Sequence, residues 1–470
     1  MYSGNFVSFV SVVFDVLSGM LPCATLRAQE IETGFRTRSE FRIEVFDDSF
    51  RQLIDPKSKI QVLATGFKWS EGPLHDKPNQ RLLFSDVPNN KIWQINKKNG
   101  QRALSIFLDP AGYEGKSPES EPGSNGLALD DQGRLIVCDH GNRRVYRLET
   151  DGSKTTLADK CDGKRFNSPN DLVISSNGDI FFTDPPYGLN DKTKHELGCF
   201  GVYCLKPDGK ILPVTRELVR PNGVTLSPDE KTLYVAQSHS PNPVYMKYAV
   251  HDDGTFGKGE LLFDAKELAG KDPGMPDGIT IDVLGNLWAT GPGGVLVISP
   301  SGKLLGRVYT GAPTANCAFV ANGNDLVMTA GNAIAIVPTK TYGVGDWTGD
   351  GAGTLLPREV VDEVSAAIES LQEGLKQGKY AEIVQSLVPA EVLEKFRAEG
   401  KLDGIVKDFS ERGAKRLENA LSNASFPLAT YSAKDSKVTF LRYRMDEERG
   451  LVREVGLRFQ KVGDKWITRF

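Results

Sequence analysis

Six short polar motifs recur along the chain, and each carries a side chain that offers an oxygen atom. The motifs read SEGP, GSNG, SPND, RPNG, MPDG and TANC, and their oxygen-bearing residues are Glu71, Asn125, Asn170, Asn222, Asp277 and Asn316. Carboxylate and amide oxygens in one set suit a hard divalent cation, with calcium first and magnesium or manganese next. The five histidines show no paired spacing, which disfavours zinc without removing it from the cations to be tested. If these residues meet in space, they form a metal site.

Taken singly, each motif has an ordinary structural explanation. Asn-Gly, Asn-Asp and Asp-Gly are common turn dipeptides, so one such motif is more often a turn than a ligand. Glu71 does not fit this explanation, because glutamate is poor turn material at the equivalent place. We therefore interpret the six residues together. Whether they can meet in space depends on the secondary structure that follows each motif.

Each motif precedes the same elements, namely a strand with alternating apolar residues, a turn and a second strand. In residues 165–188 the strands LVI and IFF flank the turn Asn177-Gly178. The motifs lie 54, 45, 52, 55 and 39 residues apart, and a period near 50 is typical of repeated four-stranded sheets. Six such sheets predict an all-β six-bladed β-propeller, which protects its strand edges by closing into a ring. Residues 43–48 or 60–66 are the expected closing strand.

The first strand of every propeller blade lines the central channel, and the second strand runs back antiparallel to it. Because the six motifs begin first strands, their side chains should meet at one mouth of the channel. Residues that follow the second strands share this mouth and form its rim. We expect His140 and Tyr187 there as substrate-binding residues, His140 orienting a hydroxyl and Tyr187 covering a sugar ring. Packing of a loop is the alternative for both.

The composition is that of a globular protein with no affinity for nucleic acid. The 470 residues carry a net charge of −4, and no basic patch interleaves with aromatic residues. An apolar segment within residues 1–28 resembles a signal peptide, so we expect a periplasmic or secreted protein, or a cytoplasmic one if this leader is not functional. No later segment is apolar enough to span a bilayer, so we expect no stable membrane span after leader removal.

The pattern of apolar residues changes after the propeller, which we assign to residues 40–340. A Gly-rich linker is expected at residues 341–356, and residues 357–470 place apolar residues at helical spacing before a group of strands. Helices followed by an antiparallel meander predict a small α+β domain. Its pattern is similar to that of nuclear-transport-factor-like domains, and an accessory or dimerisation role is expected for it.

Together the motifs resemble those of the gluconolactonase, senescence marker protein and regucalcin family of six-bladed propellers. The resemblance covers residues 62–337 and rests on SEGP, GSNGLALD, SPNDLV, FFTDPPYG, RPNGVTLSPDE and MPDGITID. It implies that Glu71, Asn222 and Asp277 are metal ligands. The family's additional asparagine, close to metal and substrate, falls on Asn170, with Asn167 as a competing match. Asn125 is the further substrate contact that the resemblance implies.

The reaction that the resemblance implies is hydrolysis of a sugar lactone, such as a gluconolactone, to the aldonic acid. A divalent cation would polarise the carbonyl, and either Asp277 as general base or a metal-bound hydroxide would provide the nucleophile. Two alternatives stay open, an arylesterase or organophosphatase on the same metal site and a non-catalytic propeller scaffold. An acidic channel mouth favours the enzymes, because a scaffold has no use for Glu71 beside Asp277.

Overall fold

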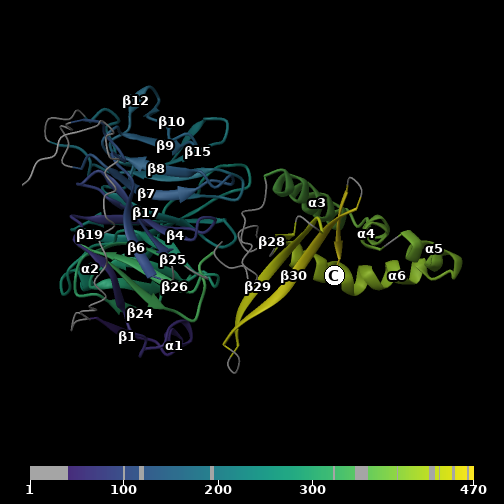
Figure 1. Cartoon of the computed structure of the whole chain (residues 1–470). Coiled ribbons are helices and arrows are strands. Elements are labelled where there is room, and N and C mark those ends of the chain that lie inside the picture. The colour runs from purple at the N-terminus through teal and green to yellow at the C-terminus, as the bar shows by residue number, and fades with distance from the viewer. Residues whose placement is uncertain are drawn as a thin grey trace, which may run out of the picture.

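The computed structural model describes residues 41–98, 101–115, 121–190, 195–320, 323–344, 358–388, 390–422, 429–432, 435–446, 450–462 and 465–469. The predicted leader, residues 1–28, lies outside these ranges. Most of the predicted linker, residues 345–356, lies outside them as well. The described chain forms a ring of sheets up to residue 344 and a smaller part with helices and one sheet from residue 358 (Figure 1).

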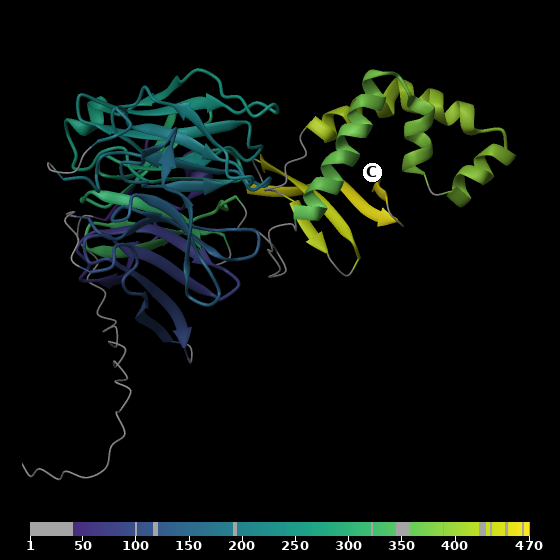
Figure 2. The ribbon, with the colours of Figure 1, turned by 90° about the horizontal axis from the view of Figure 1, so that it is seen from above.

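Six antiparallel sheets form the blades of a propeller, as the motif spacing predicts (Figures 1 and 2). Blade 1 holds β3 (Ser70–Asp76), β4 (Arg81–Asp86), β5 (Lys91–Lys98) and β6 (Gln101–Leu108), and blade 2 holds β7 (Ser124–Leu129), β8 (Leu135–Asp139), β9 (Arg144–Leu148) and β10 (Lys154–Ala158). Blade 3 holds β13 (Leu172–Ile174), β14 (Ile180–Asp184), β15 (Gly201–Leu205) and β16 (Ile211–Thr215), and blade 4 holds β17 (Pro221–Leu226), β18 (Thr232–His239), β19 (Asn242–Ala249) and β20 (Glu260–Asp264). Blade 5 holds β21 (Ile279–Ile281), β22 (Leu287–Gly291), β23 (Gly294–Ile298) and β24 (Leu304–Tyr309), and blade 6 holds β25 (Thr314–Val320), β26 (Asp325–Ala330), β27 (Ala333–Pro338) and β2 (Gln61–Thr65). Short elements β11 (Lys160–Cys161), β12 (Lys164–Arg165), α1 (Phe50–Leu53) and α2 (Lys266–Ala269) complete this part.

The first strands close into a ring around the channel. β3 contacts β7, β7 contacts β13, β13 contacts β17, β17 contacts β21, β21 contacts β25, and β25 returns to β3. β2, within the second of the two predicted closing segments, pairs with β27 and joins an early segment to the last blade. The first predicted segment instead contains β1 (Arg42–Val45), which pairs with β24 as a fifth strand of blade 5.

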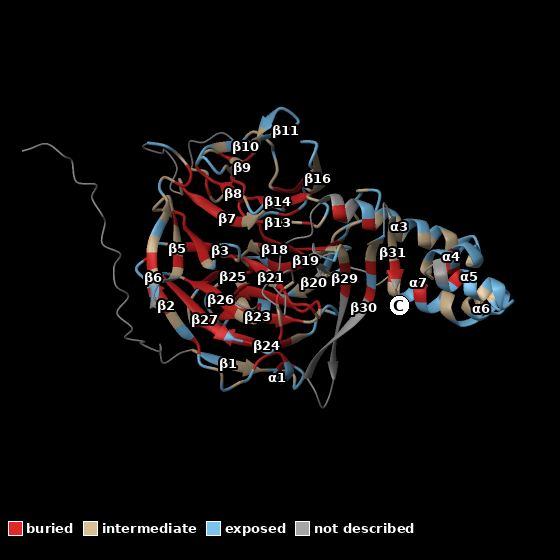
Figure 3. Ribbon diagram, turned by 45° about the vertical axis from the view of Figure 1, so that its right-hand side comes forward, coloured by how far each residue is buried: buried red, intermediate tan, exposed pale blue. Residues whose placement is uncertain are grey.

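The core lies in the seams between blades, where buried residues appear in red in Figure 3. Six clusters of buried apolar side chains each join two neighbouring blades. Between blades 5 and 6, for example, Trp288 packs edge-on against Phe319 with ring centroids 5.5 Å apart. Burying one such large side chain contributes roughly 1.5–3 kcal/mol, so the seams fix how the blades are set around the channel.

The C-terminal part contains a helical layer on an antiparallel meander, which confirms the predicted α+β order. Its elements are α3 (Arg358–Lys376), α4 (Tyr380–Leu387), α5 (Ala390–Ala398), α6 (Leu402–Asp408), the π-helical turn Phe409–Gly413, α7 (Ala414–Ser422), β28 (Ala429–Ser432), β29 (Lys437–Asp446), β30 (Gly450–Val462) and β31 (Lys465–Arg469). Val364, Leu417 and Phe459 belong to its buried core. Across the described ranges, no helix is both long and apolar enough to cross a membrane. The dimerisation role of this part stays a prediction.

Candidate metal and substrate site

The six oxygen-bearing residues of the motifs lie at or just before the start of the innermost strands, and in four blades the strand pairing there is irregular. The pairing of the first two strands shifts register between Glu71 and Leu74 in blade 1. It shifts again between Ser124 and Leu127 in blade 2. Blades 4 and 6 have the same kind of shift at their motifs. A β-bulge turns a side chain out of the regular alternation, which explains how successive polar residues in these strands face the channel region.

The glycine that follows four of these residues is required by close approach between blades. A Cβ on Gly126 would lie 2.8 Å from the Asn170 carbonyl oxygen and 2.7 Å from Asp171 Oδ1. A Cβ on Gly72, Gly223 or Gly278 would collide in the same way with the motif of the next blade. Turn chemistry is therefore not the reason for these dipeptides, because only a residue without a side chain lets the motifs touch.

Hydroxyl groups on the second strands fix the motif backbones across the same seams. Ser85 Oγ donates to the Asn125 carbonyl at 2.8 Å, and Thr183 Oγ1 donates to the Asn222 carbonyl at 2.7 Å. In each pair the hydroxyl and the carbonyl belong to neighbouring blades. These hydroxyls were not predicted from the sequence, although the recurrence of Ser or Thr at this strand position is visible in it.

Three predicted asparagines form a row of hydrogen bonds across blades 2, 3 and 4. Asn125 Nδ2 donates to Asn170 Oδ1 at 2.9 Å, and Asn170 Nδ2 donates to Asn222 Oδ1 at 2.7 Å. Asn222 Nδ2 donates to Ser238 Oγ at 2.9 Å, and the Asn222 amide favours the ionised carboxylate of Asp277. The side chains therefore meet as predicted, and the row leads to Asp277. Asn125, Asn170 and Asn222 are all buried.

Asn167, the competing match for the third asparagine, has a different environment. Its Nδ2 donates to Asp184 Oδ2 at 2.8 Å and to the Cys199 carbonyl at 3.1 Å. These contacts hold the segment before blade 3 against the end of β14. The hydrogen bonds therefore place Asn170, and not Asn167, in the amide row.

Glu71 and Asp277 bring two carboxyl groups to this mouth. Burial raises the pKa of Glu71 to about 8, and its side chain is almost inaccessible. Burial and then the charge of Glu71 raise the pKa of Asp277 well above its usual range. Two neighbouring buried carboxylates are unfavourable in their ionised forms unless a cation neutralises them.

Asp171 is a third buried carboxyl group, which the sequence analysis missed. Burial raises its pKa to about 7, although the Leu172 N–H donates a hydrogen bond to its Oδ1 at 3.0 Å and the Asn316 amide favours its ionised form. Its charge in turn raises the pKa of both Glu71 and Asp277. The signal was present in SPND, because four of the other motifs have glycine where this one has Asp171.

The oxygen atoms of this mouth fit a hard cation. Within the described ranges, Asp277 Oδ1 and Asn125 Oδ1 are buried and have no hydrogen-bond partner. Such an atom costs about 1–3 kcal/mol, a cost that ligation of a cation removes. The described residues contain no cluster of three or more histidine, cysteine, aspartate or glutamate side chains arranged for a metal. A site here would therefore combine Glu71 and Asp277 with amide oxygens, and its ligand set stays a prediction.

The two predicted rim residues follow second strands, at the same end as the motifs. His140 follows β8 and is fully buried, with Nδ1 3.1 Å from Glu121 Oε2 and Nε2 3.1 Å from Asn170 Oδ1. Tyr187 follows β14, and its hydroxyl accepts from Asn222 Nδ2 at 3.4 Å. Burial raises the pKa of the Tyr187 hydroxyl. Both residues thus touch the amide row, and their contact with a substrate stays a prediction.

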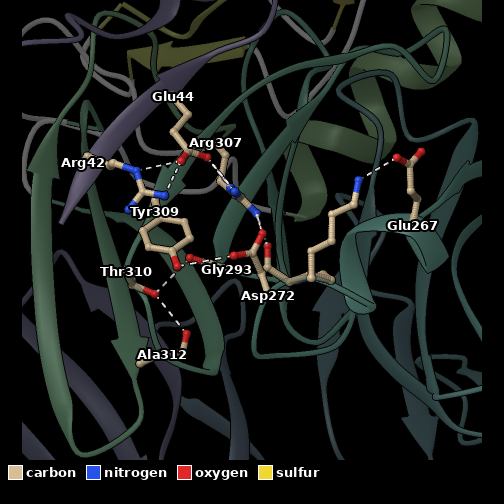
Figure 4. Close-up of polar contacts among 11 residues, drawn as sticks. Arg42, Glu44, Glu267, Asp272, Gly293, Arg307, Tyr309, Thr310 and Ala312 are labelled. Atoms are coloured by element: carbon tan, nitrogen blue, oxygen red, sulfur yellow. Dashed lines mark hydrogen bonds and ion pairs between the residues drawn. The ribbon is translucent and has the colours of Figure 1, made fainter. Parts of the chain in front are cut away.

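A buried arginine holds the loop that carries Asp277. Arg307 of β24 donates from Nη1 to Asp272 Oδ2 at 2.8 Å and from Nε to Glu44 Oε2 at 2.7 Å (Figure 4). Tyr309 adds a hydrogen bond from its hydroxyl to Asp272 Oδ1 at 3.3 Å. The outer strand β1, which supplies Glu44, is thereby tied to the loop five residues before Asp277.

Comparison with known proteins agrees with this architecture. The family model described as SMP-30/Gluconolactonase/LRE-like region matches residues 69–332, more than half of the chain, so the chain belongs to this family. It is 36% identical over 346 residues to a gluconolactonase of Zymomonas mobilis, covering 71% of this chain and 96% of that protein. It is 27% identical over 309 residues to a pentonolactonase of Haloferax volcanii, covering 64% of this chain and 94% of that one. The solved structure of a gluconolactonase from Xanthomonas campestris is similar with a TM-score of 0.56 and 30% identity, covering 63% of this chain and 95% of that chain.

Proposed function

We propose that this protein hydrolyses the ester bond of a sugar lactone, a gluconolactone or a close relative, to the aldonic acid. The observation that carries the proposal is the burial of Glu71 and Asp277 at one channel mouth, with Asp277 Oδ1 unpartnered among the described residues. The lactonases that the chain resembles support the reaction class. We propose a divalent cation, calcium first, held by Glu71, Asn222 and Asp277 with Asn170 beside them.

When bound, such a cation withdraws electron density from the lactone carbonyl and stabilises negative charge on its oxygen. Asp277 is the proposed general base, because its carboxyl group is buried at the channel mouth beside Glu71 and its Oδ1 has no hydrogen-bond partner among the described residues. Asn125 and Asn170 are proposed to bind substrate hydroxyls, and Tyr187 is proposed to cover the sugar ring. The water oxygen bonds to the carbonyl carbon while its proton goes to Asp277. The bond between that carbon and the ring oxygen then breaks, and Asp277 returns the proton to the ring oxygen, which leaves as a hydroxyl.

The Asp277→Asn variant tests the assignment of the base and ligand. We expect kcat/KM for glucono-δ-lactone to fall by about 10²–10⁴, the range for loss of a general base. Calcium affinity, measured by isothermal titration calorimetry, should fall as well. The control is Asp264→Asn, because Asp264 is an exposed carboxylate at the end of the outer strand β20. Near-wild-type activity of purified Asp277→Asn would show that the assignment is wrong.

A substrate panel separates this proposal from the other hydrolase reading. The metal-reconstituted protein is tested on glucono- and galactonolactone, on a homoserine lactone and on phenyl acetate. We expect the aldonolactones to have the highest kcat/KM and activity to be lost on exhaustive chelation. Preference for phenyl acetate would favour an arylesterase, and activity indifferent to chelation would contradict the cation.

A further inference from the structure

Glu121 lies at the channel mouth directly before blade 2, and among the described residues its hydrogen-bond contact with the site is to His140. Its Oε2 is 3.1 Å from His140 Nδ1, and its side chain is 31% exposed, whereas that of His140 is 0% exposed. An ionised carboxylate only accepts hydrogen bonds, so the Nδ1 proton of the ring points at Glu121, and Nε2 carries a proton as well when it donates to Asn170 Oδ1, because an amide oxygen only accepts. The imidazole is thus fixed from the solvent side by a residue for which the described part of the chain shows no hydrogen bond to Glu71, Asn222 or Asp277.

His140 stands at the start of the amide row. Its Nε2 is 3.1 Å from Asn170 Oδ1 and 3.5 Å from Asn125 Nδ2, the two atoms of the first hydrogen bond in the row. Each amide donates its N–H to the oxygen of the next, from Asn125 to Asn170 and from Asn170 to Asn222. The row is therefore directional.

The direction of this row matters at its far end. Asn222 Nδ2 donates to Ser238 Oγ at 2.9 Å, and Ser238 Oγ donates in turn to the carbonyl of Pro276, the residue before Asp277. The N–H groups of Asn222 therefore face the Asp277 side of the site, where the amide favours an ionised carboxylate. If the Asn170 amide turned by half a rotation, its oxygen would face Asn222 Oδ1, and two acceptors would meet. Asn222 would have to turn in response and would present its oxygen to Ser238 and to the Asp277 side of the site.

We propose that Glu121 is a positioning residue, which fixes the His140 imidazole and through it the orientation of the Asn170 and Asn222 amides around the site. The inference rests on the proposed function of this site, since it concerns the same ligands. Its competitor is a purely electrostatic role, because Glu121 also adds negative charge near Glu71 and Asp277. The two roles predict different effects when Glu121 is replaced by glutamine and when it is replaced by alanine.

Two substitutions separate positioning from charge. Glu121→Gln keeps an oxygen acceptor for His140 Nδ1 and removes the charge, whereas Glu121→Ala removes both. We expect Glu121→Ala to weaken calcium binding and kcat/KM by about tenfold or more, as loss of a residue that orients a ligand does, and Glu121→Gln to stay within about threefold of the wild type. Equal losses in both variants would overturn the inference in favour of charge.

A double-mutant cycle shows whether the effect runs through histidine. If it does, the Glu121→Ala/His140→Ala protein should bind calcium no more weakly than His140→Ala alone. If the loss of calcium affinity in the double variant equals the product of the losses in the two single variants, the inference is overturned.

Nitrogen-15 NMR of the imidazoles gives a readout that needs neither cation nor lactone. The His140 ring resonances should move in Glu121→Ala and stay near their wild-type positions in Glu121→Gln. Unchanged resonances in Glu121→Ala would overturn this inference alone. A wild-type protein that hydrolyses no lactone would overturn only the proposed function.

Discussion

Replacing Glu71 by glutamine should stabilise the metal-free protein, and only at high pH. Burial raises the pKa of Glu71 from the usual 4.5 to about 8. Because the folded pKa is the higher one, the folded state binds the proton more tightly, and stability falls as pH rises from 4.5 to 8. The loss is roughly 5 kcal/mol at pH 8.5 and roughly 1 kcal/mol at pH 5, from about 1.4 kcal/mol for each pKa unit.

Glutamine has nearly the shape of protonated glutamate and never ionises. The difference in unfolding free energy between Glu71→Gln and the wild type should therefore shift by about 4 kcal/mol in favour of the variant between pH 5 and pH 8.5. The assay is urea unfolding with excess chelator at both pH values, followed by tryptophan fluorescence. A difference that is the same at both pH values would refute the reasoning.

A matched control and a calcium arm complete this test. Glu217 is exposed, so Glu217→Gln removes the same charge from the surface and should shift the unfolding free energy by less than about 0.5 kcal/mol at either pH. Saturating calcium should reverse the order at pH 8.5, because a ligand that binds only the folded wild type stabilises it. Continued greater stability of Glu71→Gln in calcium would contradict Glu71 as a ligand.

Three further substitutions test the ring, the loop and the rim. Gly278→Ala should destabilise the folded protein by about 1–3 kcal/mol, because the added Cβ would collide with the Asn316 amide. Gly404 lies in open space, so Gly404→Ala should be neutral or stabilising in the same urea assay. Equal effects of the two substitutions would contradict this account of the motif glycines. Arg307→Met should cost about 3–5 kcal/mol in thermal unfolding, because it leaves Asp272 without its cation and Glu44 with Arg42 alone, and an unchanged melting temperature would show that the network is dispensable. Tyr187→Phe should raise KM for gluconolactone a few-fold at constant kcat in steady-state assays, and an unchanged KM would place the hydroxyl away from the substrate.

The periodic features of the fold could be predicted from the sequence. A blade needs alternating apolar residues on consecutive strands, and this pattern repeats with the motifs, so the number of blades follows from the spacing. The convergence of Glu71, Asn170 and Asp277 follows too, because each stands at the start of a first strand. Their identity as metal ligands is a separate matter, which the resemblance suggests and the proposed experiments test.

The contacts that arise between distant loops could not be predicted in this way. Glu121 lies in a connection without a repeat pattern, and only the folded chain brings it to His140. Asp171 is different, because its departure from the motif glycine was visible in the sequence. An aspartate at this position did not by itself indicate a site residue, because Asn-Asp is also a common turn dipeptide.

Cation binding and the closure of the ring can be altered separately at this mouth, because they depend on different atoms. Glycines and the Ser85 and Thr183 hydroxyls hold the motifs together through backbone groups. The carboxyl side chains of Glu71 and Asp277 take no necessary part in these backbone contacts, and their burial costs stability once they ionise. Carboxylate-to-amide substitutions should therefore remove cation binding while the ring stays closed. This asymmetry is why an inactive Glu71→Gln protein that is stabilised in the absence of cation is the expected result. A variant that unfolds more easily than the wild type at pH 8.5 in excess chelator would count against the whole arrangement.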